Sequence, residues 1–221
     1  MATHLDLEEQ EQLDQLKHFW NTYGNLITTV VVVLALAFAS WNGWQYWQRT
    51  KAAGAAALYD ELQRGAEGGD IARVERALAD MKDKFGGTAY AQQAGLLAAK
   101  ALHDKGNNDA SRAALAWVAD KAADPGYQAI ARLRLASELM DAKSYDEALK
   151  QLSVSVPKEF EALVADRKGD IYLAQGKRDE AKAAYQQAWN GMETGSDYRR
   201  LVETKLNAVG VDPQSLKASS K

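Results

Sequence analysis

Residues able to perform catalysis or bind metals are few and scattered in this sequence. It contains no cysteine, so disulfides, thiol nucleophiles and cysteine-ligated metals are excluded. Of its three histidines, His4 and His18 come early and His103 lies alone in the middle of the chain. His103 is followed by Asp104 but has no second nitrogen or thiol ligand at metal-site spacing. We therefore expect no metal site, and interpret His103 as a surface histidine at the end of a helix.

Motifs typical of nucleophilic or phosphate chemistry are also missing. A serine–histidine–acid set would depend on His103, and the sequence has no nucleophile-elbow pattern. The glycine pairs Gly68-Gly69 and Gly86-Gly87 lie in predicted turns between helices rather than in a phosphate-binding loop. We expect a protein that is not an enzyme and that holds no cofactor.

Charge is distributed unevenly along the chain. The 221 residues carry a net charge of −3, whereas residues 1–24 alone hold five carboxylates against Lys17. The rest of the chain is therefore close to neutral, and it contains no basic block. We expect no nucleic-acid partner.

Turn signals divide the chain after residue 48 into short helical segments. This part is rich in alanine and lacks the alternation of apolar and polar residues that is typical of strands. A first helix is predicted over about 52–64 and a last one over 197–208. Between them, Asp124-Pro125 predicts a helix start and Gly176 a break. The sequence therefore predicts an all-α fold.

The predicted helices fall into pairs that share the tetratricopeptide pattern of about 34 residues. Small residues let two antiparallel helices approach closely, and large residues fill the space beside them. The residues expected to pack in this way are Gly169, Tyr172, Ala181 and Tyr185 in the clearest unit, Ala136 and Ala148 in the unit before it, and Ala113 and Trp117 in the first. The alternative is an alanine-rich bundle whose spacing is accidental.

Three more aromatic residues allow two interpretations. Tyr127, Tyr145 and Trp189 could belong to an exposed binding face, because aromatic side chains often dominate protein interfaces. A core position is the preferred interpretation for each of them. Repeat domains usually bind peptides or proteins, so a binding module is the favoured class of function.

One segment is uncharged over a length that fits a membrane. Residues 18–48 contain no Asp, Glu, Lys or Arg. The 23 residues 25–47 would form a helix of about 34 Å, and a hydrocarbon core is about 30 Å thick. Aromatic residues flank it as expected at the two headgroup levels: Phe19, Trp20 and Tyr23 before, and Trp41, Trp44, Tyr46 and Trp47 after. We predict a tail over 1–24, a single transmembrane helix over 25–47 and a repeat domain over 48–221.

Two alternatives compete with the membrane anchor, and the orientation is open. A cleaved signal peptide could end at Ala37-Phe38-Ala39, but signal peptides begin with a short basic region and this one would begin with an acidic one. A buried helix of a soluble core would be shorter and less uniformly apolar. The orientation can be judged from the basic residues: Lys17 precedes the span, and Arg49 and Lys51 follow it. Read literally, the positive-inside rule then places the large domain in the cytoplasm. Because long domains cross membranes despite flanking charge, this count leaves the topology undecided.

Several stretches resemble one family. They are Leu13–Gly24, the aromatic exit Gly43-Trp44-Gln45-Tyr46-Trp47, the unit Ala165–Gly176, and Lys205-Leu206-Asn207. In these residues and in their order the chain resembles the YfgM-like ancillary subunits of the SecYEG translocon. The resemblance extends from about Leu13 to Val209.

The resemblance implies a single-pass protein of the bacterial inner membrane, with a cytoplasmic amino terminus and a periplasmic carboxy-terminal domain. It implies partners: the SecYEG translocon, a PpiD-type membrane-anchored periplasmic chaperone, and client polypeptides passed from one to the other. It carries no catalytic motif. The alternatives are a tetratricopeptide adaptor of another envelope assembly, in cell-wall synthesis or outer-membrane biogenesis, and a receptor facing the cytoplasm.

Overall fold

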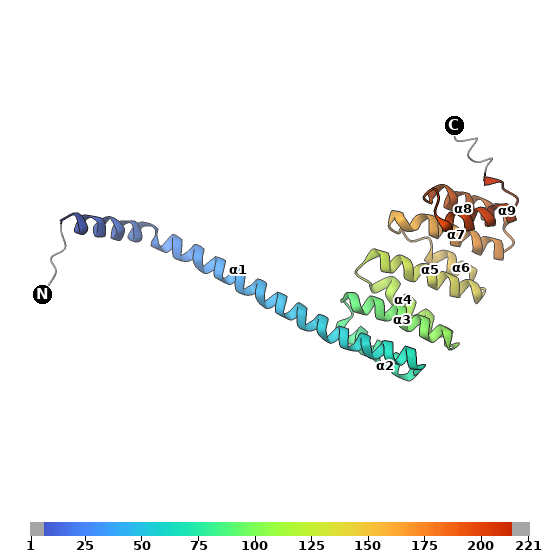
Figure 1. Ribbon diagram of the computed structural model, residues 1–221, viewed down its shortest axis with the longest axis horizontal. Helices are drawn as coiled ribbons and strands as arrows, with labels where there is room; N and C mark the ends of the chain where they lie inside the picture. The colour runs from blue at the N-terminus through green and yellow to red at the C-terminus, as the bar shows by residue number, and fades with distance from the viewer. Residues whose placement is uncertain (1–6, 214–221) are drawn as a thin grey trace, which may run out of the picture. The chain divides into compact units, whose positions relative to one another are not determined.

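The computed structural model describes residues 7–213, and helices make up nearly all of them (Figure 1). The helices are α1 (Leu7–Gly68), α2 (Ile71–Phe85), α3 (Ala89–Asp104), α4 (Asn108–Lys121), α5 (Pro125–Asp141), α6 (Tyr145–Gln151), α7 (Lys158–Ala174), α8 (Arg178–Gly191) and α9 (Asp197–Ala208). No strand occurs within 7–213, and the predicted all-α class is confirmed.

The chain forms two compact units, Met1–Lys51 and Ala52–Lys221. Helix α1 runs through the boundary, so residues 52–64 do not start a new helix as the sequence pattern predicted, and α1 ends only at Gly68. The physical reason is the run of alanines around Gly54, which continues a helix readily. Gly54 is needed for packing, because a Cβ there would lie 2.6 Å from Cζ of Phe85 on α2.

The second unit is built by repeating one turn. At each repeat the backbone of a single residue adopts positive φ, and it does so at Gly69 (69°), Gly106 (79°), Lys143 (61°), Gly176 (76°) and Gly210 (85°). In each turn this residue donates its amide to the carbonyl three residues earlier, and the next amide reaches the carbonyl five residues before itself. This is a Schellman-type ending, which satisfies the last carbonyls of the helix and reverses the chain. Four helix pairs follow one another: the end of α1 with α2, α3 with α4, α5 with α6, and α7 with α8.

The turns give the register of the repeats and correct one predicted position. The residue five places after each of the first four turns is fully buried, and these residues are Val74, Ser111, Ala148 and Ala181. Ala113, predicted to be the counterpart of Ala148 and Ala181, is exposed. The prediction assumed a spacing of 35 residues, whereas the turns at 69, 106 and 143 are 37 apart. The equivalent position is therefore Ser111.

Close helix contacts occur at the small residues. Gly169 on α7 faces the ring of Tyr185 on α8, and a Cβ added at Gly169 would lie 2.4 Å from Cε1 of that ring. In the α3–α4 pair, Gly95 has a similar role against Val118 (2.3 Å) and the half-buried Trp117 (3.4 Å). Ala136, Ala148 and Ala181 are fully buried and Tyr172 is half-buried.

The core of the second unit has two parts. The larger cluster extends from Ala55 on α1 to Ile171 on α7, and the smaller one joins α7, α8 and α9 around Tyr185, Trp189, Val202 and Leu206. Helix α7 contributes to both, so it links the two parts of the stack. Figure 1 shows the helices from α2 to α9 following one another along the stack in chain order.

Candidate membrane segment and binding surfaces

The apolar part of α1 is uncovered in the first unit. The segment from Gln10 onward is long and apolar enough to cross a membrane, and only 6% of its most apolar window is buried. Val31, Leu34 and Phe38 are 57%, 63% and 72% exposed. A surface of this kind is stable only against lipid or another apolar surface.

Polar side chains within this segment bond to their own helix. Thr29 Oγ1 donates to the carbonyl of Asn25 (2.7 Å), and Asn42 Nδ2 donates to the carbonyl of Phe38 (2.9 Å). Such back-bonding removes most of the cost of placing a hydroxyl or an amide in hydrocarbon, where no water can replace the bond. The polar residues are therefore compatible with a membrane-spanning helix.

The predicted interface aromatics are all exposed and lie near the two ends of the apolar stretch. They are Phe19, Trp20 and Tyr23 at one end and Trp41, Trp44, Tyr46 and Trp47 at the other. The ring centroids of Phe19 and Tyr23 are 5.2 Å apart, and those of Trp41 and Trp44 are 5.8 Å apart. Lys51 Nζ lies 4.7 Å from the ring centroid of Trp47. Rings and a lysine at these levels fit the headgroup region of a bilayer.

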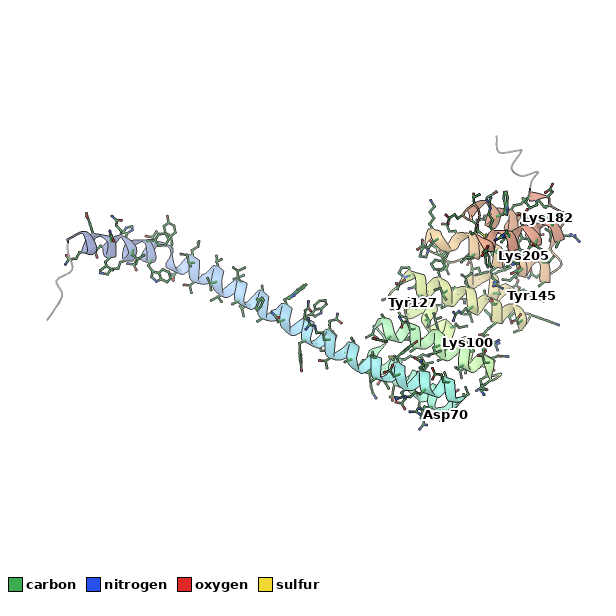
Figure 2. All side chains as sticks on the ribbon, in the orientation of Figure 1. Asp70, Lys100, Tyr127, Tyr145, Lys182 and Lys205 are labelled. Atoms are coloured by element: carbon green, nitrogen blue, oxygen red, sulfur yellow. The ribbon has the colours of Figure 1, made fainter. Side chains whose placement is uncertain are left out.

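In the repeat unit, three aromatic residues occupy equivalent positions in successive repeats, and we call them the aromatic row. Tyr90, Tyr127 and Phe160 each lie 16 residues before a turn, near the start of α3, α5 and α7. Equivalent positions share one face of the stack. Tyr90 is 37% exposed and its ring centroid is 5.9 Å from that of Tyr59, while Tyr127 and Phe160 are half-buried. Gln93 Nε2 donates to the Tyr127 hydroxyl (3.0 Å), which links α3 to α5 (Figure 2).

A hollow of about 360 Å³ lies between α3 and α5. Its lining is mostly apolar below and charged at the rim, and consists of Ala99, Lys100, His103, Leu115, Arg134, Ser137, Glu138 and Asp141. His103 is half-exposed, and its Nδ1 lies 3.5 Å from Oε1 of Glu138. Within the described part of the chain, no group of three or more His, Cys, Asp or Glu residues could hold a metal ion.

Glu138 at the edge of this hollow has fewer hydrogen-bond donors than a carboxylate can accept. Ser111 Oγ lies 2.6 Å from Oε1 of Glu138 and 2.8 Å from the carbonyl of Ala99, but its hydroxyl has a single proton to donate. Oε2 of Glu138 is buried and has no hydrogen-bond partner within residues 7–213. A buried acceptor without a partner can accept a hydrogen bond from a donor group of a bound molecule.

A second polar group joins α7, α8 and α9. Lys205 Nζ on α9 lies 2.8 Å from Oδ1 of Asp166 and 2.8 Å from Oδ1 of Asp170, both on α7 (Figure 2). Tyr198 donates its hydroxyl to Asp166 (2.8 Å), and Tyr185 donates to Asp170 (2.9 Å). Asp166 is fully buried. Burial, together with the adjacent carboxylates, raises the pKa of both tyrosines, so they remain neutral donors.

This polar group was not predicted from the sequence. Asp166, Asp170 and Lys205 were noted only as parts of a family resemblance, because Asp166 and Lys205 are 39 residues apart. The available signal is that Asp166 and Asp170 are one helical turn apart and so share a face. Lys205 and Tyr198 on α9 both bond to carboxylates of α7, so the arrangement fixes α9 against the stack.

Tyr127, Tyr145 and Trp189, for which the sequence allowed either a binding face or the core, are not freely exposed. Trp189 is 4% exposed, and the guanidinium of Arg199 lies 4.0 Å from its ring centroid. Tyr127 and Tyr145 are half-buried and pack against the larger core cluster. The structure thus places Trp189 in the core and the two tyrosines at its edge.

Comparisons with known proteins agree with this architecture. Residues 17–211 match a family model described as a tetratricopeptide repeat-like domain. A protein of Neisseria gonorrhoeae is 32% identical over 95% of this chain and 100% of its own length. One of Haemophilus influenzae is 30% identical (91% of this chain, 97% of its own), and one of Escherichia coli is 26% identical (92% and 97%). Each of these relatives is named an ancillary SecYEG translocon subunit.

Proposed function

The chain belongs to the family of tetratricopeptide repeat-like ancillary SecYEG translocon subunits, and on that premise we propose that it is a membrane-anchored scaffold that binds proteins at the translocon. The observation that carries the proposal is the uncovered apolar span of α1, which is joined to a repeat domain that has a buried apolar core of its own. One part of the chain is suited to lipid and the other to water. The match to a tetratricopeptide repeat-like domain and the names of the relatives favour binding over catalysis.

The repeat domain is proposed to bind client polypeptides and to pass them to a membrane-anchored periplasmic chaperone of the PpiD type. The aromatic row Tyr90, Tyr127 and Phe160 supports this role, because aromatic rings contribute large contact areas at low entropic cost. The hollow between α3 and α5 supports it as well, since its apolar lining and the buried Oε2 of Glu138 suit a side chain that carries a hydrogen-bond donor.

The proposed topology places residues 1–24 in the cytoplasm and residues 48–221 in the periplasm. Family membership supports it, and the excess of Lys and Arg after the span opposes it. A reporter enzyme that is active only in the periplasm, fused after Lys221, should be active. The same reporter fused before Met1 is the control and should be inactive.

Crosslinking in intact membranes tests the function. A photoreactive residue at Tyr90 should capture translocating polypeptides, and mild solubilisation of the tagged full-length protein should recover Sec components. A photoreactive residue at the exposed Ala113, which lies outside the aromatic row, is the matched control and should capture little. Recovery of cell-wall or outer-membrane assembly proteins in place of Sec components would reject the translocon role and favour an adaptor of another envelope assembly.

A further inference from the structure

The hollow between α3 and α5 contains a carboxylate whose capacity to accept hydrogen bonds is not fully used. Glu138 lines this hollow, and its side chain is 12% exposed. Its Oε2 atom is buried and accepts no hydrogen bond from residues 7–213, while its Oε1 atom lies 2.6 Å from Ser111 Oγ. A buried carboxylate oxygen without a donor is destabilising, and a donor that also carries a positive charge compensates it best.

The basic side chains around the hollow do not supply this donor. His103 Nδ1 lies 3.5 Å from Oε1, the oxygen that Ser111 already contacts. Lys100 is engaged by another residue, because its Nζ lies 2.5 Å from Oδ2 of Asp104. Arg134 is exposed and forms no ion pair with the residues that the structure describes. The buried oxygen therefore has no cation of its own.

The hollow suits a long cation in both charge and shape. With Lys100 compensated by its own partner, Glu138 and Asp141 face a single opposing charge at the rim, that of Arg134. The lining below the rim is mostly apolar and includes Leu115. A lysine side chain matches this arrangement, because its aliphatic stem packs on apolar surface and its ammonium group has three protons to donate.

Tyr127 of the aromatic row lies on the same face of α5 as the hollow. Tyr127, Arg134, Glu138 and Asp141 follow one another at intervals of seven, four and three residues, so they stay on one side of the helix. The 11 residues from Tyr127 to Glu138 correspond to about 16 Å along the helix. An extended polypeptide covers that distance with about five residues, so one segment can reach both places.

We propose that this hollow is a subsite for a basic side chain of a client polypeptide. The stem of a client lysine lies on the apolar lining, and its ammonium group donates hydrogen bonds to Glu138 and Asp141. The last torsion of a glutamate side chain is soft, so a small rotation of the carboxylate presents Oε2 to the hollow. The same client segment continues toward Tyr127. This proposal rests on the client-binding role proposed above.

Peptide binding to the full-length protein in lipid nanodiscs tests the subsite. Three acetylated and amidated peptides share an alanine–serine frame with a tyrosine about five residues away on either side of the centre. Their central residue is lysine, glutamate or norleucine, which has the lysine stem without the ammonium group. Fluorescence anisotropy measures the dissociation constants, with protein-free nanodiscs as the blank. We expect the lysine peptide to bind about tenfold more tightly than the norleucine peptide, because it alone forms a charge-assisted hydrogen bond.

Three variants assign this preference to the hollow. Glu138→Gln keeps the shape of the side chain but removes its charge, so the lysine peptide should bind no better than the norleucine peptide. Arg134→Ala removes the competing cation from an exposed position and should tighten binding of the lysine peptide several-fold. Glu180→Gln, on the exposed side of α8, is the matched control and should leave all three dissociation constants unchanged. Thermal unfolding identifies any variant that has lost its fold.

Two results would overturn the subsite. One is equal affinity for the lysine and norleucine peptides, or a preference that neither Glu138→Gln nor Arg134→Ala alters. The other is tightest binding of the glutamate peptide, weakened by Arg134→Ala, because the rim would then recognise carboxylates. Photocrosslinking from Tyr90 separates this proposal from the client-binding role. Capture of polypeptides without a preference for lysine contradicts the subsite only, whereas the absence of both capture and peptide binding contradicts the two proposals together.

Discussion

Replacing Gly169 by alanine should destabilise the repeat domain, although alanine is the better helix former. The added Cβ would lie 2.4 Å from Cε1 and 2.5 Å from Cδ1 of Tyr185, about 1 Å closer than ordinary contact. The ring cannot move aside easily, because it is 1% exposed and its hydroxyl donates to Asp170 at 2.9 Å. Relief requires either that α7 and α8 separate or that this hydrogen bond breaks.

The net effect is the difference between two terms. Overpacking a core site costs about 1–3 kcal/mol, and the upper end applies to a ring that is held on all sides. The higher helix propensity of alanine than of glycine stabilises the folded state by about 1 kcal/mol. We expect a loss of about 2 kcal/mol in the free energy of unfolding, or about 4–8 °C in Tm for a domain of this size.

Urea unfolding of the fragment 52–221, followed by circular dichroism, measures the change. Gly68→Ala is the matched control, because Gly68 ends α1 with nothing within 4 Å of its added Cβ and should be neutral or slightly stabilising. Combining Gly169→Ala with Tyr185→Leu should cost less than the sum of the two single changes, because the smaller side chain relieves the clash. A Gly169→Ala domain as stable as wild type would refute the close approach of α7 and α8.

Three further predictions concern the same domain. The fragment 52–221 should fold alone, remain soluble and give a helical circular dichroism spectrum, because both core clusters lie within it; a strand-rich spectrum would contradict the fold. Lys205→Met should cost about 3–5 kcal/mol, because it leaves Asp166 buried without its cation, and hydrogen exchange in α9 should accelerate first; unchanged exchange there would contradict the anchoring role. The pKa of Tyr185 and of Tyr198 is raised from an ordinary value of 10.0, so the stability that keeping them neutral provides is complete below about pH 10 and is lost as the pH rises above it. Replacing both by phenylalanine should flatten the decline of unfolding free energy between about pH 10 and 12, as urea titrations at each pH would show.

The sequence was sufficient for the helices and for the repeat pattern but not for the register of every repeat. Gly169, Ala181 and Tyr185 were identified because glycine, alanine and an aromatic stand at characteristic intervals in that unit. The first repeats lack such a set: Val74 and Ser111 occupy the places that alanine has at 148 and 181. A search for alanine therefore selected Ala113, two residues beyond the equivalent position.

The positive-φ turns are a better guide to the register than the packed residues. Four of the five have glycine, which a sequence shows directly, but the third has Lys143. A lysine in this conformation carries a steric cost and has no sequence signature. The contacts between Asp166 and Lys205, and between Ser111 and Glu138, were beyond prediction for a different reason, since they depend on how separate helices meet in space.

The fate of the apolar residues in the two units is the strongest physical argument for the membrane. In the repeat unit most large apolar side chains are buried or half-buried, and none is more than 47% exposed. In the first unit, eight large apolar side chains between Leu26 and Phe38 are 50–72% exposed. Burying one such side chain is worth about 1.5–3 kcal/mol, so leaving eight half-exposed in water costs on the order of 10 kcal/mol. That is comparable with the whole stability of a typical domain, about 5–15 kcal/mol. The repeat domain exposes no apolar surface of this size that could cover these side chains. The span therefore needs an apolar solvent of its own, and a bilayer about 30 Å thick supplies it.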